Sequence, residues 1–408
     1  MNLMKINCAF LFILFFYFKL FIIYILNIDF FIFMEIISHI AFNQDGSCFC
    51  LGTNKGYIIY NSSPLKKLCK REFKNGIKII EMLKRTNIMA IVGDVSNETS
   101  EFSNNKLIIW DDSLMKTISE LQFDSEILRV KIKTDKVILT TKNNNLYVIE
   151  LLKLNCLNIF EIYQNSNGLF SISSDEKILV IAFPYANCGF VKIKHYNTDI
   201  NVPHINAHDT NISFLALNVE GNLLATCSQR GTLVRIFNTF NGELIQELRR
   251  GAKKAEIHFI NFDLNNKFLA CSSNSGTIHI FSIYTSIKYL KEKGIIKNKS
   301  EKENKKEETN IKGEKIEIPK NQKSFIGSII SVLKLGISYF ESEWSFAQFR
   351  LPKSEHAKAI VSFSQFDNSI NVLTKSGNLY KASFEPNLGG ECDKINEINL
   401  FQENPENS

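Results

Sequence analysis

Two adjacent arginines followed by a glycine, Arg249, Arg250 and Gly251, are the residues of this sequence best suited to binding chemistry. A guanidinium group presents planar, paired N–H donors, which fit phosphate or carboxylate oxygens better than the ammonium group of lysine does. Successive side chains of a strand point to opposite faces, so two neighbouring arginines contact different surroundings. The pair therefore predicts two anion-binding pockets, one on each side of a strand, after which Gly251 is expected to permit a turn.

The strands that position this pair belong to a repeating unit. Each copy contains an alternating apolar strand, a polar turn, a second apolar strand, a tight turn and a third strand. In the fourth copy the first strand is expected at Leu169–Ser173, and the third strands of the seven copies are expected to begin at Tyr57, Leu107, Leu146, Phe190, Leu233, Ile278 and Leu379. These starts lie 50, 39, 44, 43, 45 and 101 residues apart. Seven such copies predict an all-β, seven-bladed β-propeller of the WD-repeat type.

Composition and motif content exclude several functions. The chain has 48 Lys and Arg against 42 Asp and Glu, a mild positive excess that permits an anionic partner. Its nine cysteines lack the spacing of a zinc site or a disulfide framework, so no metal is predicted. No nucleophile elbow, phosphate-binding loop or acid pair indicates catalysis, so neither an enzyme nor a cofactor is expected. Outside one lysine-rich segment no basic face carries aromatic residues, so nucleic acid is not an expected partner.

Several segments resemble one known family, the PROPPINs, which are the phosphoinositide-binding seven-bladed propellers of autophagy and include the WIPI proteins. The resemblance covers about residues 37–384. Its most specific part is the Leu-Arg-Arg-Gly motif at Leu248–Gly251, where the family usually has phenylalanine in place of the leucine. The other matching segments include Asn75–Asp94, Lys106–Asp112, Leu223–Phe237 and Ser342–Pro352.

The resemblance implies a non-enzymatic effector that binds phosphatidylinositol 3-phosphate and phosphatidylinositol 3,5-bisphosphate in two pockets flanking this motif. Such a protein is expected to be cytoplasmic and peripheral on phagophore, endosomal, vacuolar or plastid membranes. It is expected to recruit autophagy-type protein partners, docked around Lys55 and Asn75, for autophagosome formation or for maintenance of those membranes. The alternative is a WD-repeat scaffold that binds only proteins.

The resemblance also assigns partners to each arginine, residue by residue. The first pocket is expected to hold Arg249 together with His208, Ser228, Arg230, Thr232 and Arg235. The second is expected to hold Arg250 together with Ser272, Ser273, Thr277 and His279, with His258 as a weaker candidate. The alternatives are that the hydroxyl residues only shape turns, that the histidines are structural, and that the arginines protect an exposed strand edge.

Residues 285–341 interrupt the repeat in blade six. Ser286–Lys323 contains twelve lysines and seven glutamates, a composition expected of a disordered segment. The apolar segment Ser324–Phe340 follows, with side chains near helical spacing. The resemblance implies that this segment inserts into membranes through Phe325, Ile326, Ile329, Ile330 and Leu333. The alternative is a helix that covers the propeller.

The two ends of the chain differ in character from the repeats. Residues 1–33 are almost entirely apolar, and they are either upstream of a translation start at Met34 or a membrane anchor. A cleaved signal peptide is less natural, because no small-residue cleavage site follows. The propeller is expected to span residues 34–401, and residues 402–408 form a polar tail.

Overall fold

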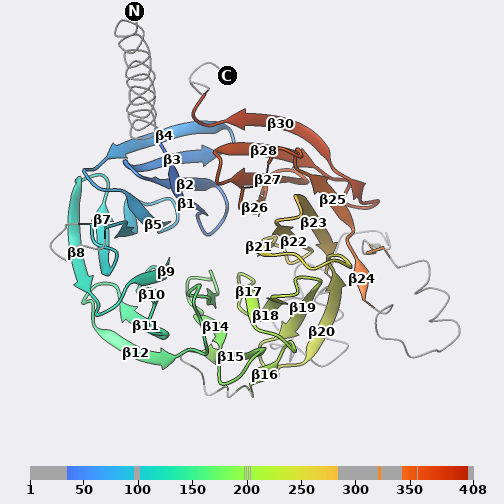
Figure 1. Ribbon diagram of the computed structural model, residues 1–408, viewed down its shortest axis with the longest axis horizontal. Helices are drawn as coiled ribbons and strands as arrows, with labels where there is room; N and C mark the ends of the chain where they lie inside the picture. The colour runs from blue at the N-terminus through green and yellow to red at the C-terminus, as the bar shows by residue number, and fades with distance from the viewer. Residues whose placement is uncertain are drawn as a thin grey trace, which may run out of the picture. The chain divides into compact units, whose positions relative to one another are not determined.

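Seven sheets stand in a ring around a central axis (Figure 1). The computed structural model of the chain describes residues 35–95, 102–196, 198, 200, 202, 204–283, 320–322, 342–355 and 357–402. Every regular element in these ranges is a strand. The predicted all-β, seven-bladed propeller is therefore confirmed.

The first four blades each contain four antiparallel strands in chain order. Blade one consists of β1 (Ile37–Phe42), β2 (Cys48–Thr53), β3 (Gly56–Ser62) and β4 (Leu65–Glu72). Blade two consists of β5 (Ile77–Met82), β6 (Ile88–Gly93), β7 (Lys106–Asp111) and β8 (Lys116–Gln122). Blade three consists of β9 (Ile127–Ile132), β10 (Lys136–Thr141), β11 (Asn145–Glu150) and β12 (Cys156–Glu161). Blade four consists of β13 (Ser171–Ile172), β14 (Val180–Pro184), β15 (Phe190–His195) and β16 (Ile205–Asn206).

Blades five and six each gain a short parallel strand at the outer edge. Blade five consists of β17 (Ile212–Leu217), β18 (Leu223–Ser228), β19 (Leu233–Asn238), β20 (Leu244–Arg249) and the added β24 (Glu343–Trp344). Blade six consists of β21 (Ile257–Phe262), β22 (Phe268–Ser273), β23 (Thr277–Ser282), β25 (Ala347–Arg350) and the added β29 (Gly390–Glu391). Blade seven consists of β26 (Ala359–Phe363), β27 (Ser369–Thr374), β28 (Asn378–Ser383) and β30 (Asp393–Asn399).

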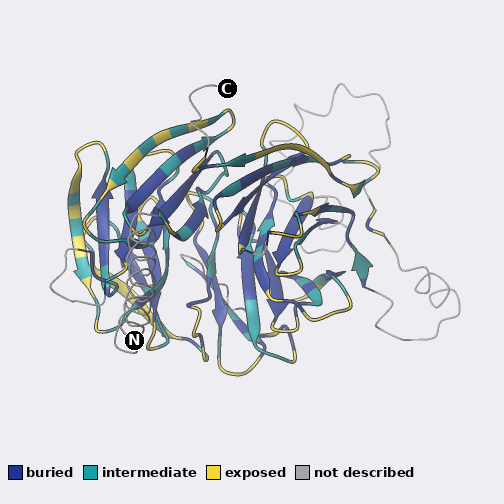
Figure 2. Ribbon diagram, turned by 45° about the horizontal axis from the view of Figure 1, so that its top comes forward, coloured by how far each residue is buried: buried dark blue, intermediate teal, exposed yellow. Residues whose placement is uncertain are grey.

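Burial differs between the second strands and the outer strands of the blades. The second strands β2 and β22 are buried at every position, because a neighbouring blade covers each face. The outer strand β4 instead alternates between half-buried and exposed residues, because its outer face meets water. Figure 2 shows this difference, with most exposed positions on the outer strands and in the loops.

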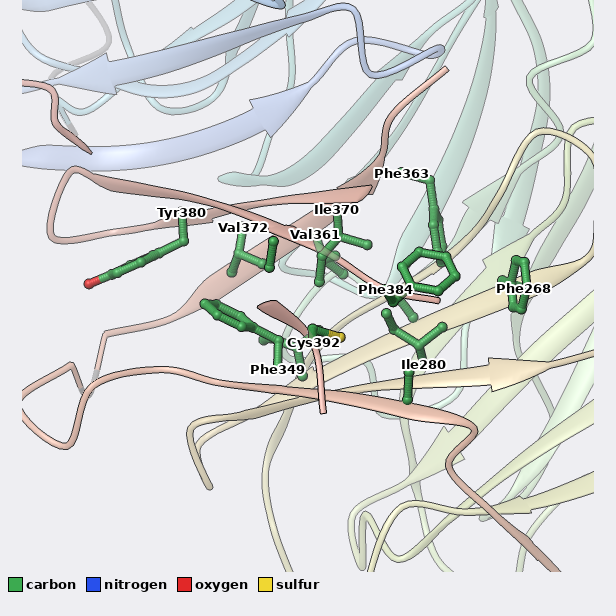
Figure 3. Close-up of a cluster of buried hydrophobic side chains, with 14 of the residues drawn as sticks. Phe268, Ile280, Phe349, Val361, Phe363, Ile370, Val372, Tyr380, Phe384 and Cys392 are labelled. Atoms are coloured by element: carbon green, nitrogen blue, oxygen red, sulfur yellow. The ribbon is translucent and has the colours of Figure 1, made fainter. Parts of the chain in front are cut away.

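Apolar side chains fill the seams between blades. Figure 3 shows the seam between blades six and seven, where side chains from both sheets meet in one cluster. Phe268 and Ile280 come from blade six, while Val361 and Val372 come from blade seven. Because each blade is a thin sheet with two apolar faces, its stability depends on both neighbours.

The ring closes between blades one and seven without an exchanged strand in the described part of the chain. Blade one contains only strands from the beginning of the described chain, and blade seven only strands from its end. Phe49 and Tyr60 of blade one are stacked with ring centroids 5.1 Å apart, in a cluster with Leu373 and Leu379 of blade seven. The Tyr60 hydroxyl also donates to the Leu400 carbonyl at 3.3 Å. Side-chain packing therefore closes the ring.

One expected strand is shorter than its sequence indicated. The first strand of blade four was expected at Leu169–Ser173, but β13 covers only Ser171–Ile172. The side-chain amide of Asn165 binds both backbone polar groups of Leu169, accepting from its N–H at 2.6 Å and donating to its carbonyl at 2.8 Å. Those groups are then not available to a β-ladder, so the strand begins later.

Some expectations concern residues outside the described ranges. They are the apolar segment 1–33, residues 403–408 of the tail, and most of the segment 285–341, including all five expected membrane-inserting residues. Of that last segment only residues 320–322 are described. There the Asn321 amide donates to the Ser282 carbonyl and to Glu343, at 2.7 and 2.8 Å.

Ring closure by packing predicts a strong effect of Phe49→Ala. Phe49 is fully buried, so the substitution leaves a cavity in the closing seam and is expected to lower the free energy of unfolding by about 3–5 kcal/mol. Urea denaturation followed by circular dichroism measures the change. The matched control is Phe366→Ala, whose side chain is 82% exposed and whose removal is expected to matter by less than about 0.5 kcal/mol. Equal effects of the two substitutions contradict closure by this seam.

Candidate functional site

The arginine pair stands at the end of the strand β20. Arg249 is the last residue of β20 and is paired with Leu233 of β19, and Arg250 follows it. Side chains of β20 alternate, so Arg249 shares a face with Glu247, while Arg250 shares a face with Leu248. Leu248 packs in the seam between blades five and six. The two arginines thus lie on opposite faces of blade five.

Arg249 is held at the outer edge of blade five. Its backbone is paired with Trp344 of the added strand β24, and its Nε donates to the Ser342 hydroxyl at 2.7 Å. Its side chain is only 5% exposed. The residue before β24 therefore covers this guanidinium group from a part of the chain 93 positions away.

Several residues expected in the first pocket lie on the same face, which turns toward blade four. Arg235 donates from Nε to Glu247 at 2.8 Å and from Nη1 to the Ala207 carbonyl at 2.7 Å. His208 bonds the Thr226 hydroxyl at 2.9 Å. Burial, and then the nearby Arg235 charge, lower the pKa of His208 to about 4, so its imidazole is neutral at neutral pH. Ser228 is two residues beyond Thr226 on β18 and shares its face.

Arg250 lies in the seam between blades five and six. Its Nε donates to the Gly231 carbonyl at 2.7 Å, and its Nη2 donates to the Lys253 carbonyl. The side chain is 6% exposed, and burial lowers its pKa from the ordinary value for arginine. These two carbonyls fix the plane of the guanidinium group within the seam.

His279, Thr277 and Ser273 share this seam with Arg250. His279 is paired with Cys271, and Cys271 packs in the cluster between blades five and six. Ser273 lies two residues after Cys271 on β22, and Thr277 lies two residues before His279 on β23, so both share the face of that pair. Burial and then the Arg250 charge lower the pKa of His279 to about 4. Its Nδ1 lies 3.2 Å from the Ser345 hydroxyl.

Ser272 and His258 lie on the other side of blade six. The Ser272 hydroxyl donates to the Ala359 carbonyl of blade seven at 2.7 Å, and the residue is fully buried. His258 Nδ1 accepts from the Ala359 N–H at 3.4 Å. The structure therefore does not bring these two residues to Arg250. Ser272 and Ser273 are neighbours on one strand, and the alternation that separates the arginines separates them as well.

A tight turn between β18 and β19 links the two expected pockets. Gly231 in this turn has φ +60°, and a Cβ there would lie 1.9 Å from the Ala255 carbonyl oxygen. The carbonyl of Thr232 accepts from the Arg250 N–H at 2.9 Å. The exposed basic residues beside this turn are Arg230, Lys253 and Lys254.

Gly251 does not have the conformation expected for it. Its φ lies outside the left-handed region, and a Cβ there would meet no atom within 4 Å. The chain bends directly after Gly251, but neither sterics nor backbone conformation requires a glycine at this position. The glycine that sterics require is Gly231, which receives the Arg250 side chain.

Four residues near the arginines were missed by sequence reasoning. Thr226 and Glu247 share faces with Ser228 and Arg249, so the two-residue period of their strands was a usable signal. Ser342 and Ser345 reach the site through β24 and β25, which follow a long gap in the repeat. No local pattern identifies which strand such a distant segment joins.

Other kinds of site are not found in the described ranges. No group of three or more His, Cys, Asp or Glu side chains is placed to hold a metal ion there. None of the described residues forms a helix of the length and apolarity needed to cross a membrane.

Comparisons with known proteins agree with the architecture. A family model described as PROPPIN matches residues 36–294. Autophagy-related protein 18e of Arabidopsis thaliana is 33% identical over 364 residues, which cover 89% of this chain and 87% of that protein. Autophagy-related protein 18 of Dictyostelium discoideum is 29% identical over 371 residues, which cover 91% of this chain and 95% of that protein.

Solved structures show the same fold. Kluyveromyces lactis Hsv2 superposes with a TM-score of 0.66 at 21% identity, covering 90% of this chain and 100% of that one. KlAtg21, solved in complex with the coiled coil of AgAtg16, superposes with a TM-score of 0.68 at 23% identity and the same coverage. At this level of identity the likeness concerns the fold alone.

The turn geometry predicts that alanine destabilises the protein at Gly231 but not at Gly251. Gly231→Ala places a Cβ against a backbone carbonyl at positive φ and is expected to destabilise the protein by about 1–3 kcal/mol. Gly251→Ala has open space and is expected to change stability by less than about 0.5 kcal/mol. Thermal and urea unfolding of both variants measure this. A larger loss at Gly251 than at Gly231 contradicts the assignment.

The two lowered histidine pKa values predict a loss of stability in acid. In the unfolded chain, His208 and His279 bind a proton below about pH 6.5. In the folded protein they bind it only near pH 4. Their contribution to the free energy of unfolding is complete above pH 6.5. It is lost as the pH falls toward 4, at up to about 1.4 kcal/mol per pH unit for each residue. Urea unfolding between pH 7 and pH 4.5 is expected to show a shallower slope for His279→Gln. An unchanged slope contradicts the prediction.

Proposed function

Because this chain belongs to the PROPPIN family, a family of phosphoinositide-binding propellers of autophagy, we propose that it binds 3-phosphorylated phosphoinositides on membranes without catalysing a reaction. Its ligands are phosphatidylinositol 3-phosphate and phosphatidylinositol 3,5-bisphosphate, held in two pockets beside Leu248–Gly251. The observation that supports this most is the placement of Arg249 and Arg250 on opposite faces of blade five.

The first pocket lies on the blade-four side of Arg249. The guanidinium group of Arg249 and exposed Arg230 at the nearby turn supply its charge, and Arg235 adds hydrogen-bond donors while paired with Glu247. Glu247 and the Ala207 carbonyl orient Arg235. The remaining hydrogen-bonding groups come from His208, Ser228 and Thr232. A neutral imidazole beside arginine contributes a donor without adding a buried charge.

The second pocket lies on the blade-six side of Arg250, with Ser273, Thr277 and His279. Two carbonyls hold Nε and Nη2 of Arg250, and the described residues supply no acceptor for its Nη1. Nη1 therefore donates to a phosphate oxygen, and the hydroxyls and His279 bind neighbouring oxygens. Ser272 takes no part, because its hydroxyl is bound to blade seven.

Access to both arginines requires a local rearrangement, because their side chains are nearly covered. The Ser342 hydroxyl accepts a hydrogen bond from Arg249 Nε, and the Lys253 carbonyl accepts one from Arg250 Nη2. Lys253 lies in an exposed turn, so its displacement uncovers little apolar surface. Phosphate oxygens replace both neutral acceptors, and a charged acceptor forms the stronger hydrogen bond.

Membrane residence comes from several weak contacts acting together. The exposed cations Arg230, Lys253 and Lys254 lie beside the pockets and attract anionic lipid. The apolar segment Ser324–Phe340 inserts into the bilayer through Phe325, Ile326, Ile329, Ile330 and Leu333, a role that rests on its sequence and on the family resemblance. Two head-group pockets and one insertion on the same molecule give an avidity that no single contact provides.

The membrane-bound propeller recruits protein partners. Its relatives from Arabidopsis and Dictyostelium are named as autophagy-related proteins, and the similar KlAtg21 was solved with a coiled coil bound. We assign the chain to the cytoplasm and to the surface of phagophore, endosomal, vacuolar or plastid membranes. Partner docking is a second activity of the same propeller and does not depend on the arginine pair.

Replacing both arginines tests lipid binding. The Arg249→Thr, Arg250→Thr double variant is expected to lose at least about tenfold in affinity for vesicles containing phosphatidylinositol 3-phosphate, since each charge-assisted hydrogen bond contributes about 1.5–3 kcal/mol. Liposome flotation measures this, with phosphatidylcholine vesicles as background and circular dichroism as a check on folding. The matched control is Arg85→Thr, an exposed arginine of blade two that is expected to change nothing.

Single variants separate the two pockets in the same assay series. Calorimetric titration with a soluble short-chain phosphatidylinositol 3-phosphate is expected to give two sites in the unsubstituted protein and one in either single variant. Unchanged flotation of the double variant overturns lipid binding through this pair. The alternative function, a scaffold that binds only proteins, is then favoured. Loss of both sites in one single variant contradicts independent pockets.

A further inference from the structure

A cavity of about 520 Å³ lies inside the ring and is lined by residues of all seven innermost strands. Figure 1 shows these strands, among them β1, β9, β17 and β26, facing the common axis. This volume falls within the range of roughly 300–1,000 Å³ that small-molecule pockets occupy. The residues assigned to the two lipid pockets do not line it, so it is a separate site.

The charged residues that line this cavity are mostly cationic. Arg129, Lys131, Lys358 and Lys375 line it, against the carboxylates of Glu81 and Glu256. Lys131 donates to Glu81 at 2.7 Å, so these two charges neutralise one another. Three cations then face the single exposed carboxylate of Glu256, which leaves a net formal charge of +2. A positively lined concave site concentrates anions.

Arg129 is the residue of this cavity whose hydrogen-bonding capacity is least used. It is half-buried, and its guanidinium group lies over the Phe214 ring, 5.8 Å from the centroid. Within the described residues no acceptor bonds this group, although a guanidinium carries five N–H donors. Burial lowers the pKa of Arg129, and the nearby Glu81 carboxylate opposes that shift.

His39 gives a second, independent indication in the same cavity. Its Nε2 is buried without a hydrogen-bond partner and lies 3.9 Å from the Glu81 carboxylate. Burial, followed by the charges of Lys131, Lys358, Arg129 and Lys375, lowers the pKa of His39 to about 3. The imidazole of His39 is therefore neutral in this cationic surrounding, and its Nε2 has no hydrogen-bond partner among the described residues.

We propose that this central cavity binds a small, soluble, phosphorylated anion, with Arg129, Lys358 and Lys375 as the charged contacts and His39 as a neutral one. The net positive charge requires more than one negative charge in return, and a phosphate ester carries nearly two at neutral pH. Arginine offers it the planar fork that phosphate oxygens accept. We assign a soluble ligand because the innermost strands of all seven blades ring the cavity, whereas a lipid head group stays attached to its bilayer.

Pyrophosphate binding tests the site in the Arg249→Thr, Arg250→Thr background, where the lipid pockets contribute nothing. Calorimetry is expected to show one site whose affinity falls at least about tenfold in Arg129→Gln. The exposed substitutions Lys358→Gln and Lys375→Gln are expected to weaken binding about two- to fivefold each without affecting the fold. Arg85→Gln, at an exposed arginine outside the cavity, is the control and is expected to leave the affinity unchanged.

The outcomes separate this proposal from lipid binding. Absence of a pyrophosphate site, or equal affinity in the lysine variants and in Arg85→Gln, overturns it. In the chain with both arginines intact, Lys358→Gln is expected to leave flotation on phosphatidylinositol 3-phosphate vesicles unchanged. A loss of flotation in that variant shows that the cavity takes a lipid head group, which overturns the assignment of a soluble ligand. Failure of the lipid pockets alone leaves the calorimetric result unaffected.

Discussion

Apolar packing between neighbouring blades is the interaction on which the other features of this structure depend. Strands such as β2 and β22 are buried on both faces, and only an adjacent blade covers each face. Across the described part of the chain, one hydrophobic cluster fills each of the seven seams, including the seam between the first blade and the last. Because no described strand is exchanged between the first and last blades, both ends of the propeller depend on this packing.

The same packing decides which neighbouring blade each side chain of a strand faces. A residue on an outer strand faces one seam, and its neighbour faces the next. Arg249 and Arg250 are thereby directed to different blades, and Glu247 is placed where it orients Arg235. The same alternation separates Ser272 from Ser273, so the Ser272 hydroxyl donates to blade seven while Ser273 faces blade five. Adjacent polar residues in a propeller therefore serve separate sites.

Cationic groups occupy two distinct environments in this propeller. At the edge of blade five, backbone carbonyls and a serine hydroxyl hold the arginines within seams, so a ligand must compete with internal partners. Facing the axis, the Arg129 guanidinium group lies over an aromatic ring without a hydrogen-bond acceptor among the described residues, and the imidazole of His39 stays neutral. The first arrangement depends on local opening, whereas the second is already open to a diffusing anion.

The amino-acid sequence by itself determined the number of blades, the position of nearly every inner strand and the opposed directions of the two arginines. These features follow from two-residue periodicity and turn chemistry, which are local properties. Tertiary structure alone decided that Ser342 covers Arg249, that Gly231 rather than Gly251 is the required glycine, and that the ring closes by packing. It also brought residues of seven strands to one cavity. Such contacts join segments far apart in the chain, and no short-range pattern encodes them.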